Sequence, residues 1–184
     1  SVTIGNSITT ISNYLFAGCS NITSITIPDS VTTIGAGAFL SCSNLTSITI
    51  LDSVTSIGNK AFTNCNSTLY SEYEFGKYVG DSTNPYAVLI ELTNKNMSTY
   101  TIHPDTKIIA DGVFSSCGHL TSITIPDSVT AIGNMAFKQC STLMSVMIPD
   151  SVTTIGAGAF VYCSNLTSIT IPNSVTTIEQ ETFA

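Results

Sequence analysis

Six cysteines carry the most reactive side chains of this sequence, and their spacing is regular. They form two runs of three in which successive members are 23 residues apart: Cys19, Cys42, Cys65, Cys117, Cys140 and Cys163. By number alone they predict a disulfide framework in a small secreted protein. Equivalent residues on adjacent strands, however, lie about 4.8 Å apart with parallel side chains, whereas bridged Cβ atoms need about 3.5–4.5 Å and converging vectors. The spacing therefore predicts buried free thiols, and the redox compartment stays open.

Four aspartates also recur at one interval and could attract calcium. They are Asp29, Asp52, Asp127 and Asp150. Carboxylates about 5 Å apart repel by roughly 1 kcal/mol in water, which Ca²⁺ would relieve, but Asp is expected in such turns for backbone reasons. His103 and His119 lack the partner spacing of a metal site, and no nucleophile, base and orienting acid combine. We expect no cofactor, no metal and no catalytic residue.

Rows of hydroxyl side chains offer a binding surface of a different kind. They recur at the same interval: Thr23, Ser24, Thr26, Thr46, Ser47, Thr49, Thr121, Ser122 and Thr124. An uncharged hydroxyl surface offers many weak hydrogen bonds, although threonine also simply suits an exposed strand. Met144 and Met147 replace threonine in one copy. The pair is either an adaptable binding patch or neutral drift.

All of these positions belong to a 23-residue unit, of which Leu120 to Thr142 is one copy. Its L-x-x-I-x-I segment predicts a strand with one buried face, Pro-Asp-Ser a turn, and V-x-x-I a second strand. Glycine then permits a tight turn, at Gly35, Gly58, Gly133 and Gly156, and A-F-x-x-C predicts a short helical or 3-10 turn. A fixed period of this length predicts a repeat solenoid, mostly β, of about seven stacked turns.

One insert, residues 66–96, interrupts the repeat. Phe62 and Phe114 are 52 residues apart, one period plus 29, and register returns at Met97. Two strand-like runs, 69–75 and 87–92, flank a turn-rich segment, which predicts a β-hairpin or a distorted extra turn of the solenoid. The insert holds four of the seven tyrosines: Tyr70, Tyr73, Tyr78 and Tyr86. It either continues the stack or protrudes as a recognition element.

Composition excludes several classes of partner. The net charge is −7, with five lysines and no arginine. Nucleic acids and anionic lipids both require clustered cationic side chains, so we expect neither as a partner. The sequence contains no run of 18 apolar residues, and we therefore expect no membrane insertion. No leader peptide is evident at Ser1.

The unit L-x-x-I-x-I-P-x-x-V-x-x-I-x-x-x-A-F-x-x-C closely resembles the repeat of BspA-like leucine-rich repeat proteins, over about 150 of the 184 residues. The insert, in which NPYAVLIEL leads into YTIHPDTKII, resembles an irregular unit of that family. The resemblance implies a leucine-rich-repeat horseshoe or β-solenoid on a microbial surface or secreted, with members associated with adhesion. It supplies no catalytic residue. We expect residues 1–184 to be a single leucine-rich repeat domain from a longer array.

Two functions of different classes follow. The first is a non-enzymatic extracellular module that binds a protein of a host or neighbouring cell through the concave strand face and the insert. The second is a self-stacking surface element without a specific ligand, which associates end to end because the chain begins and ends in mid-repeat. An ice-binding threonine array would need a flat face, and nothing else in the sequence favours it.

Overall fold

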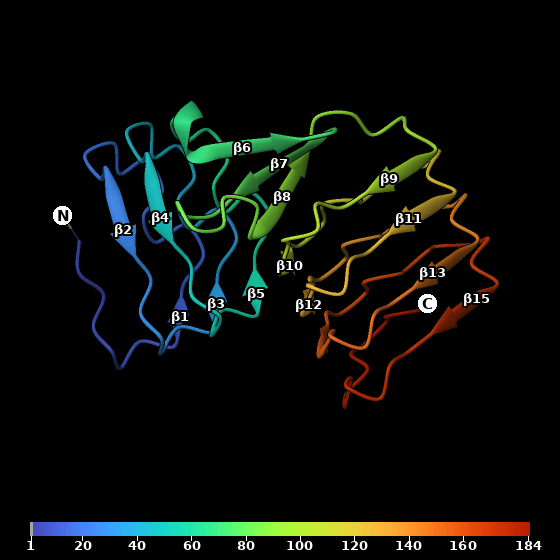
Figure 1. The fold of residues 1–184 in the computed structure, drawn as a ribbon. Helices are drawn as coiled ribbons and strands as arrows, with labels where there is room; N and C mark the ends of the chain where they lie inside the picture. The colour runs from blue at the N-terminus through green and yellow to red at the C-terminus, as the bar shows by residue number, and fades with distance from the viewer. Residues whose placement is uncertain (1) are drawn as a thin grey trace.

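The computed structural model describes residues 2–184, in which the repeat coils into a β-solenoid (Figure 1). The L-x-x-I-x-I segments form three-residue long strands: β2 (Ser24–Thr26), β4 (Ser47–Thr49), β9 (Thr99–Thr101), β11 (Ser122–Thr124), β13 (Ser145–Met147) and β15 (Ser168–Thr170). The V-x-x-I segments form two-residue short strands: β1 (Thr10–Ile11), β3 (Thr33–Ile34), β5 (Ser56–Ile57), β10 (Ile108–Ile109), β12 (Ala131–Ile132) and β14 (Thr154–Ile155). Long and short strands lie on different sides of the coil.

Strands of successive turns pair in parallel with the register of the sequence repeat. Ile25 of β2 lies opposite Ile48 of β4, and Ile109 of β10 lies opposite Ile132 of β12. A shift of 23 residues thus superposes the apolar side chains of one turn on those of the next. The predicted repeat solenoid is confirmed.

Phenylalanine rings stack along the interior of the coil. Phe16, Phe39 and Phe62 follow one another at ring-centroid distances of 5.3 and 5.4 Å. A second stack runs from Phe114 through Phe137 and Phe160 to Phe183, at 4.9, 5.0 and 5.8 Å. Because one turn alone cannot bury such a ring, each turn depends on its neighbours for its core.

The corner formed by A-F-x-x-C is not an α-helical turn, and of the two predicted forms it shares the i to i−3 hydrogen bonds of a 3-10 turn. Its amides alternate between two kinds of acceptor: Ala38 N donates to Gly35 O at 3.2 Å, whereas Phe39 N donates to Ala61 O of the next turn at 2.8 Å. Ser41, at φ +60°, is one of the left-handed residues that allow this alternation. An α-helix requires i to i−4 bonds and right-handed backbone throughout, so the bonds to the next turn and the left-handed residues exclude it.

The repeated glycine before this corner is required for close approach. A Cβ atom on Gly133 would lie 2.6 Å from the Asp111 backbone nitrogen of the preceding turn. The sequence predicts glycine here for a tight turn, but its φ is not in the left-handed range. Only a residue without a side chain lets the two turns come this close.

The insert adds η1 (Ser67–Leu69), β6 (Tyr70–Tyr73), β7 (Gly76–Val79) and β8 (Val88–Leu92). β8 pairs in parallel with β10 and takes the place of a short strand, while β7 pairs antiparallel with both β6 and β8. Both predicted forms, the hairpin and the extra turn, are therefore present. The sequence prediction missed β7, because Gly76 and Gly80 made that segment look like a turn.

All six cysteines are free, as their spacing predicts. Each thiol that bonds does so to a phenylalanine carbonyl of the preceding turn, as in Cys42 Sγ to Phe16 O at 3.0 Å and Cys140 Sγ to Phe114 O at 3.1 Å. Burial raises the pKa of Cys65 to about 11. The thiols thus serve packing and backbone satisfaction.

Candidate functional site

The predicted hydroxyl rows lie on the outward face of the long strands, but part of their hydrogen-bonding capacity is used within the protein. Thr46 Oγ1 donates to Thr23 O at 3.2 Å, and Thr121 Oγ1 donates to Ser98 O at 2.9 Å. The same bond recurs from Thr167 to Met144 O at 3.2 Å. In these three units the first threonine therefore ties its turn to the preceding one. The other exposed hydroxyls of the predicted rows stay available to a partner: Thr23, Ser24, Thr26, Ser47, Ser122 and Thr124.

The methionine pair stands out on this face. Met144 is 56% exposed and Met147 is 82% exposed, and both belong to the turn of β13. Residue 144 carries no hydroxyl to bond the preceding turn, and β11 and β13 lie in separate sheets although they are in contact. Flexible, polarizable side chains beside this break in strand pairing are suited to contact an apolar partner surface.

The four insert tyrosines do not form a common exposed surface. Tyr78 is fully buried, and its hydroxyl lies 3.0 Å from the Tyr100 hydroxyl. Tyr70 is half-buried, donates to Phe62 O at 2.5 Å and accepts from Cys65 N at 2.9 Å. Tyr78 is therefore part of the core, and Tyr70 holds the insert against the turn before it.

Tyr73 and Tyr86 form an aromatic cluster with His103. The rings of Tyr86 and His103 stack with centroids 3.7 Å apart, and Tyr73 meets His103 edge-on at 4.8 Å. Both tyrosines are partly buried. The cluster attaches the hairpin to the turn that follows it, and only its rim can reach a partner.

Phe75 is the exposed aromatic residue of the insert, and the sequence prediction passed over it in favour of the tyrosines. It sits at the β6–β7 turn with 43% of its surface exposed. Its carbonyl accepts from Thr93 N at 2.8 Å and Thr93 Oγ1 at 3.1 Å. Next to it, Glu74 accepts from Thr101 N of β9 at 3.4 Å. The hairpin tip is thus fixed over the edge of β9. The sequence did contain an indication of this exposure, because a two-residue turn between paired strands exposes both of its side chains.

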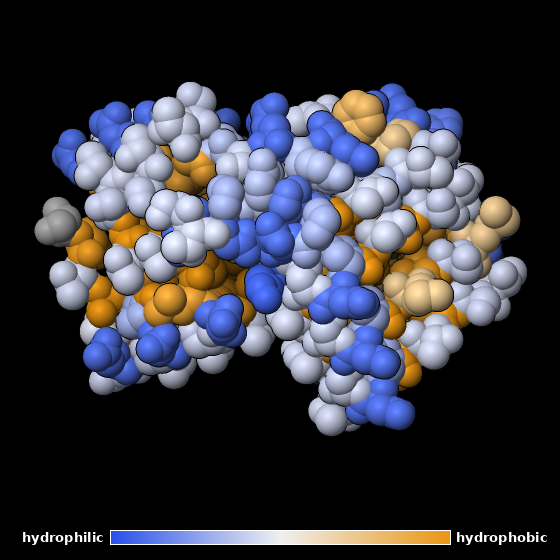
Figure 2. Space-filling view, in the orientation of Figure 1, coloured by the Kyte–Doolittle hydropathy of each residue, from blue (hydrophilic) through white to orange (hydrophobic). Residues whose placement is uncertain are grey.

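The junction between the turn that ends at Cys65 and the turn that begins at Met97 is where the solenoid departs from regularity. Among residues 2–184, Phe62 and Phe114 are the successive repeat phenylalanines that do not stack. Figure 2 shows the outline narrowing between the two halves, with strongly polar side chains there as well as along the lower margins, and with apolar surface visible on both halves. The insert therefore separates two regular stacks.

A groove of about 600 Å³, the junction groove, lies on the short-strand side of this junction. Three parts of the chain line it: Ile50, Leu51, Asp52, Val54 and Thr55 from the turn of β5; Asp81, Thr83, Asn84, Ala87 and Val88 from the insert; and Lys107, Ile108, Thr130 and Thr153 from the following turns. Sequence reasoning placed binding on the long-strand side and on the tyrosines, and did not find this groove.

Two carboxyl groups near the junction titrate unusually. Hydrogen bonds from the Thr83 hydroxyl and from the Asn84 and Thr83 amides lower the pKa of Asp81. Burial raises the pKa of Asp111, despite hydrogen bonds from Asn134. Within the described residues, no three His, Cys, Asp or Glu side chains come together as a metal site, and no helix is long and apolar enough to cross a bilayer.

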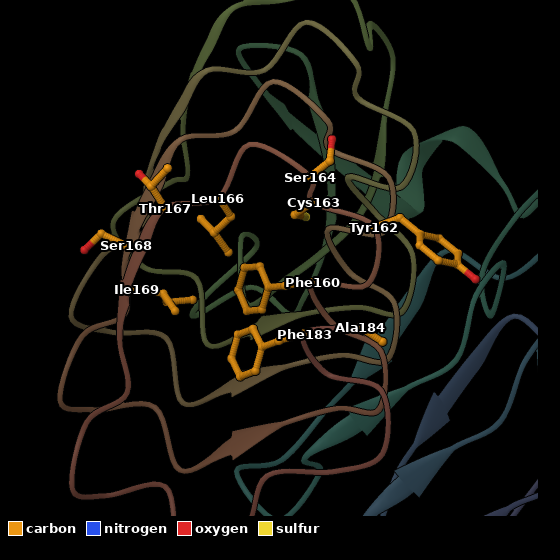
Figure 3. A pocket seen from close by; sticks show the side chains of 10 residues that line it. All are labelled: Phe160, Tyr162, Cys163, Ser164, Leu166, Thr167, Ser168, Ile169, Phe183 and Ala184. Carbon is orange, nitrogen blue, oxygen red and sulfur yellow. The ribbon is translucent and has the colours of Figure 1, made fainter.

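A second hollow, of about 780 Å³, opens at the last described turn. Figure 3 shows Phe160, Leu166 and Phe183 turned toward it, whereas Tyr162 points away. Phe160 is already buried beneath the ring of Phe183, so Leu166 and Phe183 are the side chains that a further turn would cover. The hollow is thus the exposed end of the apolar interior.

A family model places these features among known repeats. The model of the BspA-type leucine-rich repeat region matches residues 1–76 and 91–184, in six copies. The unmatched residues, 77–90, contain most of β7 and the loop that leads into β8. No curated protein matches the chain in sequence.

Several crystal structures of bacterial proteins are similar to this fold. A leucine-rich repeat protein of Eubacterium ventriosum is 22% identical, with a TM-score of 0.56, over 94% of this chain and 60% of that one. The pneumococcal vaccine antigen PcpA is 20% identical, with a TM-score of 0.50, over 95% and 45%. A leucine-rich cell surface protein of Faecalibacterium prausnitzii is 34% identical, with a TM-score of 0.40, over 92% and 45%. The chain therefore spans between 45% and 60% of these proteins.

Proposed function

This chain belongs to the BspA-type leucine-rich repeat family, and from that membership we propose that it is a non-enzymatic module that binds a protein outside the cell. Leucine-rich repeats present an extended strand surface to partners, and members of this family are associated with microbial surfaces and adhesion. We propose the same setting, extracellular or at the cell surface. The partner is a protein of a host or neighbouring cell.

The observation that carries this proposal is the exposure of three apolar side chains at positions where the repeat is broken. Phe75 caps the insert hairpin beside β9, and Met144 and Met147 interrupt the hydroxyl rows two strands further along. Exposed aromatic and methionine side chains surrounded by polar groups are typical of the centres of protein interfaces. The hydroxyls around them supply weak, uncharged hydrogen bonds.

The test measures binding to immobilised extracellular-matrix proteins by biolayer interferometry. The double variant Met144→Thr/Met147→Thr restores the residue of the repeat, and should weaken binding about tenfold or more, as loss of an interface centre does. Met135→Gly is the matched control, because Met135 is 45% exposed at a corner where other turns carry glycine. Equal affinity for the double variant and the control would remove the methionine pair from the interface.

A second candidate function rests on the hollow of Figure 3. Its apolar lining would favour stacking of a second copy end to end, as a surface-array element. Sedimentation velocity across a hundredfold concentration range tests this directly. A variant with Phe183→Asp should shift to smaller species if stacking occurs, and a concentration-independent monomer would remove this candidate.

A further inference from the structure

We propose that the junction groove binds an extended, positively charged polypeptide segment at the open end of the β5 edge, next to Thr55. The inference rests on the proposed protein-binding function and adds to it a second site with a partner of defined chemistry. Four features support it: an unpaired backbone carbonyl, exposed apolar side chains at positions that are buried elsewhere, an acidic rim, and a groove that exists because of the insert.

The backbone edge is the first feature. In regular turns the carbonyl before a short strand accepts two or three hydrogen bonds from the next turn. Thr32 O, for example, accepts from Thr55 N at 2.9 Å, Ser56 N at 3.2 Å and Thr55 Oγ1 at 3.5 Å. Within residues 2–184 no donor reaches Thr55 O, because β5 ends its sheet and β8 pairs with β10 instead. At the other end of β5 the edge is closed, since Ile57 O accepts from Asp111 N at 2.9 Å. The open end of the edge, at Thr55, can accept a backbone N–H of an extended segment from another chain.

The apolar floor of the groove is the second feature. The isoleucine that closes each long-strand segment is buried in the regular turns, with Ile27 at 0% and Ile148 at 5% exposure. Its equivalent Ile50 is partly exposed and lines the groove. Leu51 follows it, where other turns carry proline, and also faces the groove. Covering such side chains with an apolar residue of a bound segment would contribute roughly 25 cal/mol per Å² buried.

Charge selects the kind of segment. Asp52 and Asp81 line the groove with a single cation, Lys107, and the chain carries a net charge of −7. The hydrogen bonds that Asp81 accepts from Thr83 and Asn84 lower the pKa of its carboxyl, so that it stays ionised at neutral pH. A lysine or arginine side chain of a bound segment would lie close to these carboxylates and gain electrostatic steering.

The remaining lining favours a peptide over a sugar. Of the described residues that line the groove, none is aromatic, so a sugar ring has no stacking partner there. Thr55 O can accept an N–H, which a peptide backbone supplies at regular intervals. A strand of about five residues spans about 17 Å. Such a segment would donate one backbone amide to Thr55 O, while its alternating side chains meet the apolar floor and the acidic rim in turn.

The experiment measures fluorescence anisotropy with a labelled pentapeptide that carries a lysine at each end and three β-branched residues between them, acetyl-KVTVK-amide, titrated with the full chain. We expect saturable binding with a Kd on the order of 100 μM, typical for a short and flexible ligand. Asp52→Lys should weaken it about tenfold. The matched control is Asp29→Lys, which makes the same charge change at the same repeat position in a regular turn and should change Kd less than about twofold.

Two further arms separate the backbone contribution from charge alone. The same peptide with its central amides N-methylated keeps its charge but loses its donors, and should bind at least about tenfold more weakly. Spermidine at concentrations that neutralise the rim should weaken peptide binding no more than Asp52→Lys does, because it competes for the carboxylates and not for Thr55 O. Absence of peptide binding, equal loss with Asp29→Lys and Asp52→Lys, or full binding of the N-methylated peptide would each overturn the proposal.

Failure of this proposal is distinguishable from failure of the general function. If Met144→Thr/Met147→Thr abolishes matrix-protein binding while the peptide still binds, both sites stand. If matrix-protein binding persists in the wild type and the peptide does not bind, the groove proposal falls and the protein-binding function stands.

Discussion

The regular turns and the insert cover the same apolar interior by different means. A regular turn stacks one phenylalanine on the next and bonds its threonine, serine and cysteine side chains to the backbone of the turn before it. The insert instead crosses the solenoid with an antiparallel hairpin and fixes it with a tyrosine pair and a tyrosine–histidine stack. Regular turns bond part of their polar side chains internally, whereas the junction leaves Thr55 O without a donor among residues 2–184, a groove and an exposed phenylalanine. We therefore propose that recognition lies where the repeat is broken.

The largest contrast should appear between two phenylalanines, one from each region. Phe137 is fully buried between two stacked rings, so Phe137→Ala should cost about 3–5 kcal/mol of unfolding free energy in urea. Phe75→Ala, at the exposed hairpin tip, should change it by less than about 0.5 kcal/mol. Similar losses for both would mean that the tip is a structural contact and not a binding anchor.

A smaller loss of stability should follow from adding a side chain where two regular turns approach closely. Gly133→Ala would place a Cβ 2.6 Å from the Asp111 nitrogen and should cost about 1–3 kcal/mol. Gly118→Ala is the control, because the nearest atom to its Cβ, Ser141 Oγ, is 3.9 Å away. Thermal unfolding followed by circular dichroism compares the two, and equal melting temperatures would contradict the close-approach explanation.

Within the insert, the buried tyrosine pair should matter less than the phenylalanine stack. Tyr78→Phe removes the hydroxyl that contacts the Tyr100 hydroxyl at 3.0 Å and accepts from His103 N at 3.3 Å, and should cost about 1–2 kcal/mol. For Tyr86→Phe we expect almost no change, since within residues 2–184 its hydroxyl makes no hydrogen bond. Urea titrations of both variants, with amide exchange at residue 103, would show whether the hairpin loosens alone.

The smallest predicted effect is on the pH dependence of the free energy of unfolding. It is tested by replacing Asp111 with the asparagine found at its repeat position in other turns. Burial raises the pKa of Asp111 above its unfolded value of about 3.9. At pH values between the unfolded and the folded pKa of Asp111, folding therefore takes up a proton. In this range the free energy of unfolding rises as the pH falls. Asp111→Asn should flatten this slope relative to the wild type, and Asp29→Asn should not. Identical slopes for both variants would contradict the burial of Asp111.

The sequence predicted the regular part of the molecule well because its physical determinants are local and repeated. Ile25, Phe39 and Cys42 recur at one interval, and a side chain that recurs in this way must stack on its equivalents. The corner could not be predicted, because its amides bond alternately within the turn and to the next one. The groove could not be predicted either. It depends on β8 pairing with β10 so that Thr55 O has no donor, which is a property of three segments far apart in the chain.

The site was predicted only in part. Met144 and Met147 are exposed as their substitution for threonine suggested, whereas Tyr78 is buried although composition had marked the insert tyrosines as a group. Composition reveals where a sequence departs from its repeat. It does not reveal which side of the new strands faces the core.

Removal of the insert tests the central claim, that the regular repeat is scaffold and that recognition lies where it is broken, in the insert and at the methionine pair. Deleting the 29 residues from Asn66 to Asn94 joins Cys65 to Lys95 and brings Phe62 and Phe114 to the regular 23-residue spacing. The shortened protein should fold with uninterrupted stacking and yet bind immobilised matrix proteins at least about tenfold more weakly than the wild type. A folded deletion variant with wild-type affinity in the same interferometry assay would contradict the claim and return recognition to the regular turns.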